Sequence, residues 1–306
     1  MSLINRWKIL TLTFLVISGV AVGWIIFGTS KNSASNPYPL IDISRNFIPQ
    51  NDFIVNIQPL REQLQKIVED NGKDNISIYF EFLNTGANIQ INNELRFYPA
   101  SLIKIPSVLV TMKKIENGDW NLNNELILFE TDKDSRYGEL YKYPVGSIFT
   151  IEKLLKILLI DSDNTAHKIL KRNLTDEEFE KLQKGIGLDE LFDENYKISA
   201  KEYSRLFRSL YTSSFLKREY SQQILSWLTE TPFNNFLASG LPKDIIFSHK
   251  IGEDNKGNNY LDSGIVYLFN RPYLLTTMIK ECNKEKAEEI MKNVSRAAYD
   301  YIKNYE

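Results

Sequence analysis

The sequence is poor in the side chains that most often build metal centres and covalent cross-links. It has one cysteine, Cys282, so no disulfide can form within the chain. It has two histidines, His167 and His249, which excludes a histidine-rich metal site. A Ser-His-Asp triad would have to use one of these two, and no G-x-S-x-G segment surrounds a suitable serine. The formal net charge of −2 offers no basic surplus for a nucleic-acid partner.

A single long apolar run lies near the N-terminus. Arg6 and Lys8 precede an uncharged segment, 9–27, which as a helix would be roughly 28 Å long at about 1.5 Å per residue. This length matches the hydrocarbon layer of a membrane, and the preceding basic residues predict a cytoplasmic N-terminus. We expect residues 1–28 to be an uncleaved single-pass anchor; a cleaved signal peptide is the alternative. The rest of the chain would then be extracytoplasmic.

The residues after the anchor divide into a polar connection and one domain. Residues 29–51 contain many Ser, Asn and Pro residues, which is typical of a flexible linker. Residues 52–306 carry the hydrophobic patterns of a folded domain, without an internal repeat. Strands are predicted towards its two ends, at 76–82, 88–91, 245–251, 263–269 and 273–279.

Helices are predicted between and around these strands. The spacing of apolar residues indicates helices at 55–70, 101–117, 151–160, 162–172, 176–184, 199–211, 217–228 and 284–302. Ser199 and Glu202 form a capping box at the start of one of them. Because strands come first and last, we expect an α+β fold. Both groups of strands would join one antiparallel sheet, beside an all-helical insertion.

The four residues Ser101-Leu-Ile-Lys104 place a hydroxyl and an amine one helical turn apart. At about 100° per residue, Ser101 and Lys104 lie on one face of the predicted helix. Ser101 would lie at the helix N-terminus, where unpaired backbone N–H groups and the helix dipole favour negative charge. A serine beside a lysine in this setting can be an activated nucleophile for an acyl group. Such a short pattern also occurs by chance, so the rest of the sequence decides its meaning.

A second polar motif, Ser162-Asp163-Asn164, opens the predicted helix at 162–172. The hydroxyl of Ser162 could pass a proton to a leaving nitrogen if it lay near Ser101. Asn164 could hydrogen-bond both a substrate amide and the lysine of the first motif. The alternative is that these residues only cap the helix, since Ser, Asp and Asn are all good capping residues.

A third motif, Lys250-Ile251-Gly252, ends a predicted strand. Lys250 could bind a substrate carboxylate, and Gly252 allows a backbone to approach closely. The N–H of Glu253 could then join that of Ser101 in an oxyanion hole. The alternative is a surface lysine before a strand-ending glycine.

Taken together and in this order, S-x-x-K, S-D-N and K-x-G resemble the motifs of the penicillin-recognising serine hydrolases, the group of class A β-lactamases and D,D-peptidases. The surrounding segments are similar as well: Phe97-Tyr-Pro-Ala-Ser101, Asp161 to Ala166, and Gly240-Leu-Pro242. The resemblance runs from about residue 55 to the C-terminus. It implies a β-lactamase/D,D-peptidase-like fold, with a five-stranded antiparallel sheet flanked by helices and an all-helical lobe. This agrees with the order of strands and helices predicted above.

The resemblance also implies a role for each motif residue. Ser101 would be acylated, with Lys104 as its neighbouring base, made partly neutral by burial and by nearby Lys250. Ser162 would relay the proton, Asn164 would bind the substrate amide, and Lys250 would bind its carboxylate. The substrate would be a β-lactam or the D-Ala-D-Ala end of a peptidoglycan stem, and no cofactor or metal is implied.

Two departures from the family pattern change what is expected. Ile251 stands where the third motif normally has Thr or Ser, so a hydroxyl for the substrate carboxylate is missing, a loss of about 1.5–3 kcal/mol. No Glu-x-x-Leu-Asn segment, whose glutamate activates the deacylating water in class A β-lactamases, lies between Asn164 and Lys250. Glu190 and Glu194 occupy a shortened polar loop, where solvated charges are expected. Deacylation by water is therefore expected to be slow.

Three functions fit this sequence. The first is a membrane-anchored hydrolase that opens a β-lactam, and the second is a D,D-carboxypeptidase or penicillin-binding protein acting on peptidoglycan. The third is a non-catalytic peptidoglycan-binding protein on the same fold, although a pure binder needs no such set of polar motif residues. His249 is adjacent to Lys250 but should point to the opposite face of its strand, which favours a structural role.

Overall fold

The computed structural model describes residues 38–41, 56–254 and 256–305. The predicted anchor at 1–28 lies outside these residues, as does all of the predicted linker except 38–41. Within the described ranges, no helix is both long and apolar enough to cross a membrane. The chain divides into two units between Pro39 and Leu40, and the fold described below is that of the second unit.

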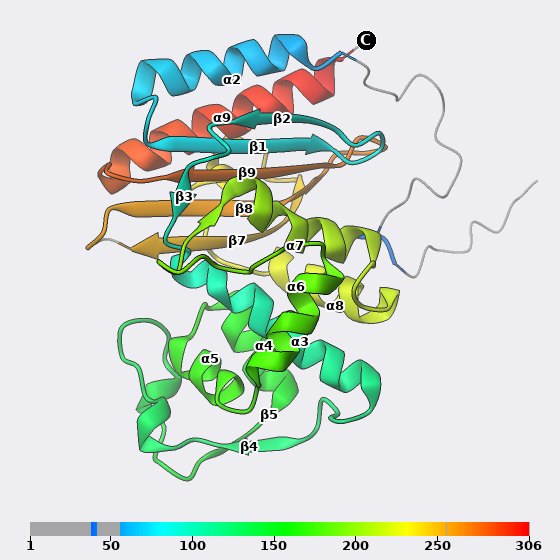
Figure 1. The fold of residues 1–306 in the computed structure, drawn as a ribbon, viewed down its shortest axis with the longest axis vertical. Helices are drawn as coiled ribbons and strands as arrows, with labels where there is room; N and C mark the ends of the chain where they lie inside the picture. Colours follow the sequence, from blue (N-terminus) through cyan, green and yellow to red (C-terminus); the bar gives the residue numbers. More distant parts are fainter. Residues whose placement is uncertain (1–37, 42–55, 255, 306) are drawn as a thin grey trace, which may run out of the picture. The chain divides into compact units, whose positions relative to one another are not determined.

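A five-stranded antiparallel sheet forms the centre of the domain, with the strand order β2-β1-β9-β8-β7 (Figure 1). β1 pairs with β9 along its whole length, from Ile76 opposite Ile279 to Phe82 opposite Tyr273. The sheet therefore joins strands from the two ends of the domain, as predicted, and leaves β7 at one edge. The strands are β1 (Ile76–Phe82), β2 (Ala87–Ile91), β7 (Ile246–Asp254), β8 (Asn259–Tyr267) and β9 (Tyr273–Ile279).

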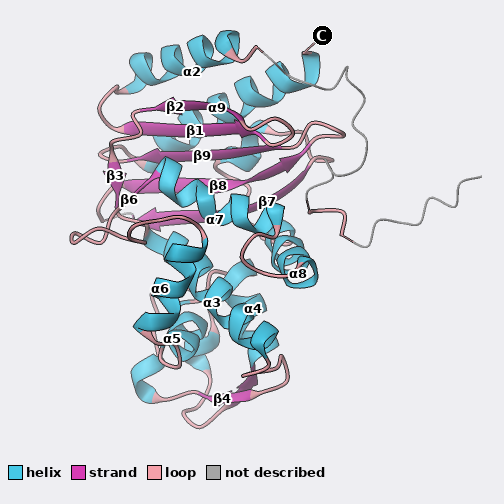
Figure 2. Ribbon diagram, turned by 45° about the vertical axis from the view of Figure 1, so that its right-hand side comes forward, coloured by secondary structure: helices cyan, strands magenta, loops and turns pink. Residues whose placement is uncertain are grey.

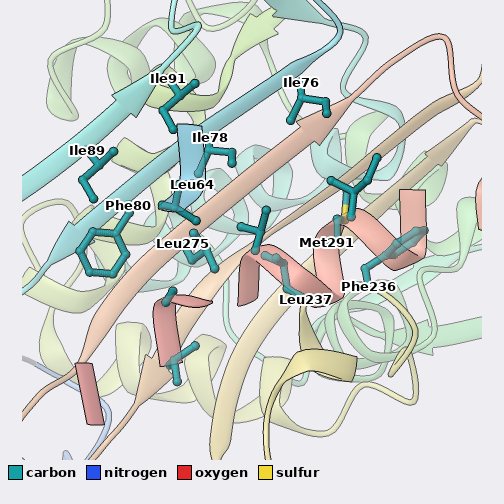
Figure 3. Close-up of a cluster of buried hydrophobic side chains, with 14 of the residues drawn as sticks. Leu64, Ile76, Ile78, Phe80, Ile89, Ile91, Phe236, Leu237, Leu275 and Met291 are labelled. Atoms are coloured by element: carbon teal, nitrogen blue, oxygen red, sulfur yellow. The ribbon is translucent and has the colours of Figure 1, made fainter. Parts of the chain in front are cut away.

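Helices cover both faces of this sheet (Figures 1 and 2). α2 (Gln58–Asn71) and α9 (Lys284–Asn304) pack against one another on one face, and α7 (Ala200–Thr212) lies across the other. Figure 3 shows apolar side chains of the first face, from α2, β1, β2, β9 and α9, gathered into one buried cluster. Burying such side chains stabilises the domain by about 25 cal/mol per Å² of apolar surface.

β1 is buried on both of its faces, although its sequence alternates between apolar and polar residues as in a half-buried strand. The apolar positions, Phe80 among them, belong to the cluster beneath α2 and α9. Glu81 faces the other way, where its carboxylate accepts a hydrogen bond from Tyr79 at 2.8 Å and pairs with Arg208 of α7 at 3.2 Å. Because Arg208 of α7 pairs with Glu81, a strand of alternating apolar and polar residues can be buried on both faces.

The remaining helices form a lobe beside the sheet, below it in Figure 1. Its central helix is α3, in which every residue from Lys104 to Met112 is buried. Two small strand pairs lie outside the central sheet, β3 with β6 and β4 with β5, and the second pair belongs to the lobe (Figure 1). The remaining elements of the domain are β3 (Arg96–Phe97), η2 (Ala100–Ile103), α3 (Lys104–Asn117), β4 (Glu125–Ile127), η3 (Glu130–Asp132), η4 (Leu140–Lys142), β5 (Ile148–Thr150), α4 (Ile151–Ile160), α5 (Asn164–Lys171), α6 (Asp176–Gly185), β6 (Ile198–Ser199), α8 (Arg218–Thr229) and η5 (Leu237–Gly240), of which η5 packs against α9 and not in the lobe.

The α+β fold with an antiparallel sheet and a helical lobe is confirmed, and the predicted capping box of Ser199 and Glu202 opens α7. The lobe is not all-helical as predicted, because β4 and β5 pair within it. Two boundaries near the motifs were wrong. The strand of the third motif continues to Asp254, so Lys250-Ile251-Gly252 lies within β7 and not at its end. The helix after the second motif begins at Asn164, because Ser162 has a left-handed φ of 57° and cannot join it.

Candidate active site

The amine of Lys104 lies at the centre of a polar cluster between α3 and α5. Its Nζ is 2.9 Å from Ser101 Oγ, 3.0 Å from Ser162 Oγ, 2.6 Å from the Ser162 carbonyl oxygen and 2.8 Å from Asn164 Oδ1. Residues separated by about 60 positions in the sequence therefore meet at one atom. A protonated amine has three N–H donors for these four oxygens. A neutral amine has a lone pair that can accept the hydroxyl proton of Ser101.

Unusual backbone conformations place the two hydroxyls of this cluster. Ser101 was predicted to be the first residue of the α-helix. In the structure it lies in the 3-10 helix η2, one turn before the first residue of α3. The preceding Ala100 has a φ of 46°, and Ser162 has a φ of 57°. Left-handed conformations of residues other than glycine cost of order 1–3 kcal/mol and occur preferentially at functional sites. The fold thus holds Ser101 and Ser162 in conformations that other contacts must stabilise.

Asp163 supplies those contacts at the second motif. Its carboxylate caps α5 by accepting from the Ala166 N–H at 2.8 Å, and it also accepts from the N–H groups of Glu139 and Leu140 at 2.7 and 2.8 Å. The residues of Ser162-Asp163-Asn164 therefore have both of the expected roles, helix capping and a place in the polar cluster. Asp163 is the helix cap, whereas Ser162 and Asn164 on either side of it face Lys104.

Burial lowers the pKa of Lys104 to about 7, against the opposing effects of Asp163 and Asp134, which raise it. The nearby Arg136 guanidinium lowers it further. This lowered pKa agrees with the expectation that burial leaves Lys104 partly neutral near neutral pH. The pKa of Lys250 also lies well below its usual range, mainly because of burial and then because of repulsion by Lys104.

Lys250 projects from the edge strand β7 and is only 1% exposed. Its Nζ has no hydrogen-bond partner among the described residues. The contact that it does make is with an aromatic ring, since Nζ lies 5.6 Å from the centre of Phe233. The Phe233 ring is in turn 5.9 Å from that of Tyr137. A buried amine without a hydrogen bond is costly, and an anion beside Phe233 would offset that cost.

The neighbours of Lys250 in β7 have structural environments. Ile251 is 5% exposed and belongs to the apolar cluster beneath α2 and α9. Strand alternation thus turns it away from Lys250. His249 is buried, its Nδ1 is 2.9 Å from Asp262 Oδ1, and its ring stacks on Phe247. The structural role expected for His249 is confirmed.

Gly252 brings β7 close to the turn that carries Ser101. A Cβ at this position would lie 2.7 Å from the carbonyl oxygen of Pro99, two residues before Ser101. Glycine is therefore required for this approach, whatever substrate binds there. The side chain of Glu253 accepts two hydrogen bonds from Lys284 at 2.9 Å. The part of its N–H group in an oxyanion hole stays a prediction.

The loop at 186–197, which was expected to lack a deacylating base, is tied to β3 by an ion cluster. Arg96 lies 2.7 Å from Asp193, 3.1 Å from Glu202 and 3.5 Å from Glu190. Glu190 also lines a cavity of about 280 Å³ whose walls are Gly187, Leu188, Asp189, Glu190, Glu202 and Arg205. Glu194 is exposed. Neither this cavity nor the ion cluster includes Ser101 or Lys104.

Several residues near the site come from no recognised motif. Asp134 accepts a hydrogen bond from Asn164 Nδ2 at 3.3 Å and is held by Arg136. One turn further along α3 and α5, Ser107 Oγ is 2.9 Å from His167 Nε2. Burial lowers the pKa of His167 to about 3, so the ring stays neutral. Its hydroxyl partner is Ser107 and not Ser101, so it is not placed as the base of a Ser-His-Asp triad. In the described part of the chain, no group of three or more His, Cys, Asp or Glu side chains could hold a metal ion.

Comparisons with known proteins identify the family of the chain and agree with its fold. A family model described as the β-lactamase enzyme family matches residues 59–302. β-Lactamase VEB-1 from Pseudomonas aeruginosa is 23% identical over 252 residues, which is 72% of this chain and 83% of VEB-1. The solved structure of PBP-A has a TM-score of 0.74 at 23% identity, covering 81% of this chain and 97% of PBP-A. A variant of PBP-A is an acyl-enzyme complex with penicillin G. The extended-spectrum β-lactamase TLA-3 has a TM-score of 0.74 at 18% identity, covering 81% of this chain and 99% of TLA-3.

Proposed function

Because the chain belongs to the β-lactamase enzyme family and is a serine hydrolase of amide bonds, we propose a role for the first motif. Ser101 is the nucleophile, and Lys104 is the base that activates it. The observation that carries the proposal is the 2.9 Å contact between Lys104 Nζ and Ser101 Oγ. With a pKa of about 7, Lys104 is partly neutral near neutral pH and can take the hydroxyl proton. The Ser101 oxygen would then attack the carbonyl carbon and form an acyl-enzyme.

The other motif residues would bind the substrate and return the proton. Ser162 lies 3.0 Å from Lys104 Nζ, so its hydroxyl can pass the proton from the amine to the leaving nitrogen. Asn164 would bind the amide of the acyl group. Lys250, a buried amine without a hydrogen bond among the described residues, would bind the substrate carboxylate. The N–H groups of Ser101 and Glu253 would stabilise the oxyanion.

The substrate that we propose is a β-lactam or a D-Ala-D-Ala stem, with an acyl-enzyme that reacts slowly with water. This is supported by Glu190, the loop carboxylate that is engaged by Arg96 and faces a separate cavity. An enzyme without a positioned base for the deacylating water would be trapped by penicillin as the acyl-enzyme. The lack of such a base therefore favours a D,D-peptidase or penicillin-binding protein over a β-lactamase. The acyl-enzyme of the PBP-A variant with penicillin G is a precedent for such a complex on this fold.

We also propose that the enzyme works outside the cell membrane, anchored by residues 1–28. The support is the uncharged apolar run at 9–27 with basic residues before it, followed by a polar connection. Peptidoglycan and β-lactams are both met on that side of the membrane, so the location fits the proposed substrates.

Intact-protein mass spectrometry after incubation with penicillin G tests the proposal. We expect a stable adduct on Ser101 in the wild type and none in Ser101→Ala. Nitrocefin turnover separates the two substrate classes, since a trapped enzyme gives one stoichiometric burst and a β-lactamase gives continued hydrolysis. Continued fast hydrolysis would disprove slow deacylation. The lack of both an adduct and nitrocefin hydrolysis would favour the non-catalytic binding protein.

A further inference from the structure

Asp134, which lies in the segment between η3 and η4, is a buried carboxylate with an unusually complete set of partners. Its side chain is 4% exposed. Arg136 donates to it from Nη2 at 2.6 Å, from Nε at 3.0 and 3.2 Å, and from its backbone N–H at 3.1 Å. Lys168 Nζ lies 3.4 Å away. The remaining contact is with the site, because Asn164 Nδ2 donates to Asp134 Oδ1 at 3.3 Å.

This last contact determines which way the side-chain amide of Asn164 can point. The amide has an accepting oxygen at one end and an NH₂ donor at the other. In the observed orientation, the oxygen accepts from Lys104 Nζ at 2.8 Å and the NH₂ group donates to Asp134. A flipped amide would set its NH₂ group against the amine of Lys104 and its oxygen against a carboxylate. Two favourable contacts would become two repulsive ones, so Asp134 selects one orientation.

We propose that Asp134, clamped by Arg136, is a positioning residue for acylation, which fixes the Asn164 amide with its oxygen on Lys104 and one N–H directed to the substrate amide. The inference rests on the proposed function, since it assumes that Ser101 attacks an amide bound beside Asn164. Asp134 acts through Asn164 and needs no contact with the substrate. Arg136, whose side chain is 80% exposed, acts one step further out by holding the carboxylate.

The charges of Asp134 and Arg136 affect the pKa of Lys104, so the pH dependence of acylation distinguishes a positioning role from a purely structural one. The charged groups that face Lys104 are Asp163 and Asp134, which raise its pKa, and Arg136, which lowers it. The amine also faces Lys250 and the neutral ring of His167. Removing the charge of Asp134 should let Lys104 lose its proton at lower pH. Removing the charge of Arg136 should have the opposite effect.

The experiment measures the rate of adduct formation with penicillin G against pH in the full chain, for the wild type and for four variants. Asp134→Ala removes the acceptor and should slow acylation at least about tenfold. Asp134→Asn keeps an acceptor for Asn164, so it should restore part of that rate, with the acid limb of the profile moved to lower pH. Arg136→Gln should move the acid limb to higher pH.

Asp132→Asn is the matched control. Asp132 lies two residues away, is also buried and also pairs with an arginine, Arg172, but it contacts Phe129 and not Asn164. It should acylate as the wild type does, with the same pH profile. Wild-type acylation by Asp134→Ala, or equal shifts in Asp132→Asn, would overturn this inference alone. A wild type that forms no adduct on Ser101 and does not hydrolyse nitrocefin would overturn the proposed function with it.

Discussion

Lys104 is the residue at which the energetics of the fold and the chemistry of the site meet. Withdrawing an amine from water is unfavourable, and the site offsets this with three hydroxyl or carbonyl contacts and one amide contact. The same withdrawal lowers the pKa of Lys104 to about 7, far below that of a solvated lysine. Stability is therefore given up to obtain a base that works near neutral pH.

The rate of acylation should rise as the pH rises through about 7 and level off above it, because the neutral form of Lys104 accepts the proton. The measurement is the rate of adduct formation with penicillin G across this range. Lys104→Arg keeps a permanent charge, so it should slow the reaction by about 10²–10⁴-fold. A rate that is flat through pH 7, or that falls as the pH rises, would contradict the assignment of Lys104 as base.

Ile251 should matter more for stability than its place in the third motif suggests. Ile251→Thr puts a hydroxyl into the apolar cluster beneath α2 and α9, so we expect unfolding to become easier by about 1–3 kcal/mol. Chemical denaturation of the variant measures this loss. Ile246→Thr, at a position of the same strand that is 51% exposed, is the control and should change stability little. Equal losses in the two variants would show that strand propensity, not burial, is responsible.

At the scale of elements, the loop at 137–140 and the start of α5 form one unit around Asp163. The unit is closed by Gly138, whose φ of 91° is left-handed and whose added Cβ would lie 2.0 Å from Asp163 Oδ2. Displacing Asp163 would release both the loop and the conformation of Ser162.

Gly138→Ala should therefore lower both the melting temperature and the acylation rate, because the methyl group and the carboxylate of Asp163 cannot occupy the same space. Gly146→Ala is the matched control, since Gly146 has a similar φ of 88° but nothing within 4 Å of the added Cβ. It should cost only the backbone strain, about 1 kcal/mol. Similar melting temperatures for the two variants would show that contact with Asp163 is not what matters.

The sequence predicts elements well where turn residues bound a hydrophobic pattern. β1, β9 and α4 begin and end at the predicted residues. α5 begins two residues later than predicted, because three successive residues are all good caps and only the tertiary contacts of Asp163 choose between them. β3 and β6 are two residues long and carry no periodic signal.

The same limit applies to the site. The resemblance of the three motifs to those of the penicillin-recognising serine hydrolases implies that Ser101, Lys104, Ser162 and Asn164 meet, and the structure brings them together. Asp134 and Arg136 come from an irregular segment, where no spacing indicates that they will meet Asn164. The signal that could have found them is the local one, an aspartate two residues before an arginine in a segment otherwise lacking apolar pattern. It is too common to stand out.

At the scale of the whole molecule, the proposed anchor determines where the reaction takes place. The full chain, expressed in bacteria, should sediment with membranes, and its domain should be cleaved by protease added to intact spheroplasts, because the basic residues before 9–27 predict a cytoplasmic N-terminus. A chain starting at residue 52 and lacking the run should be found in the soluble fraction. Full-length protein in the soluble fraction, or a domain protected in intact spheroplasts, would contradict the proposal.

The pairing of β1 with β9 has a consequence for how the domain is made. Ile76 and Ile279 are partners in the sheet but lie at opposite ends of the domain in the sequence. During synthesis, β1 and β2 emerge early as a hairpin, before β9, the other neighbour of β1 in the sheet, has been made. Contacts between such distant residues slow folding and leave a strand edge open to wrong pairing. The central sheet therefore cannot be completed until β9 has left the ribosome.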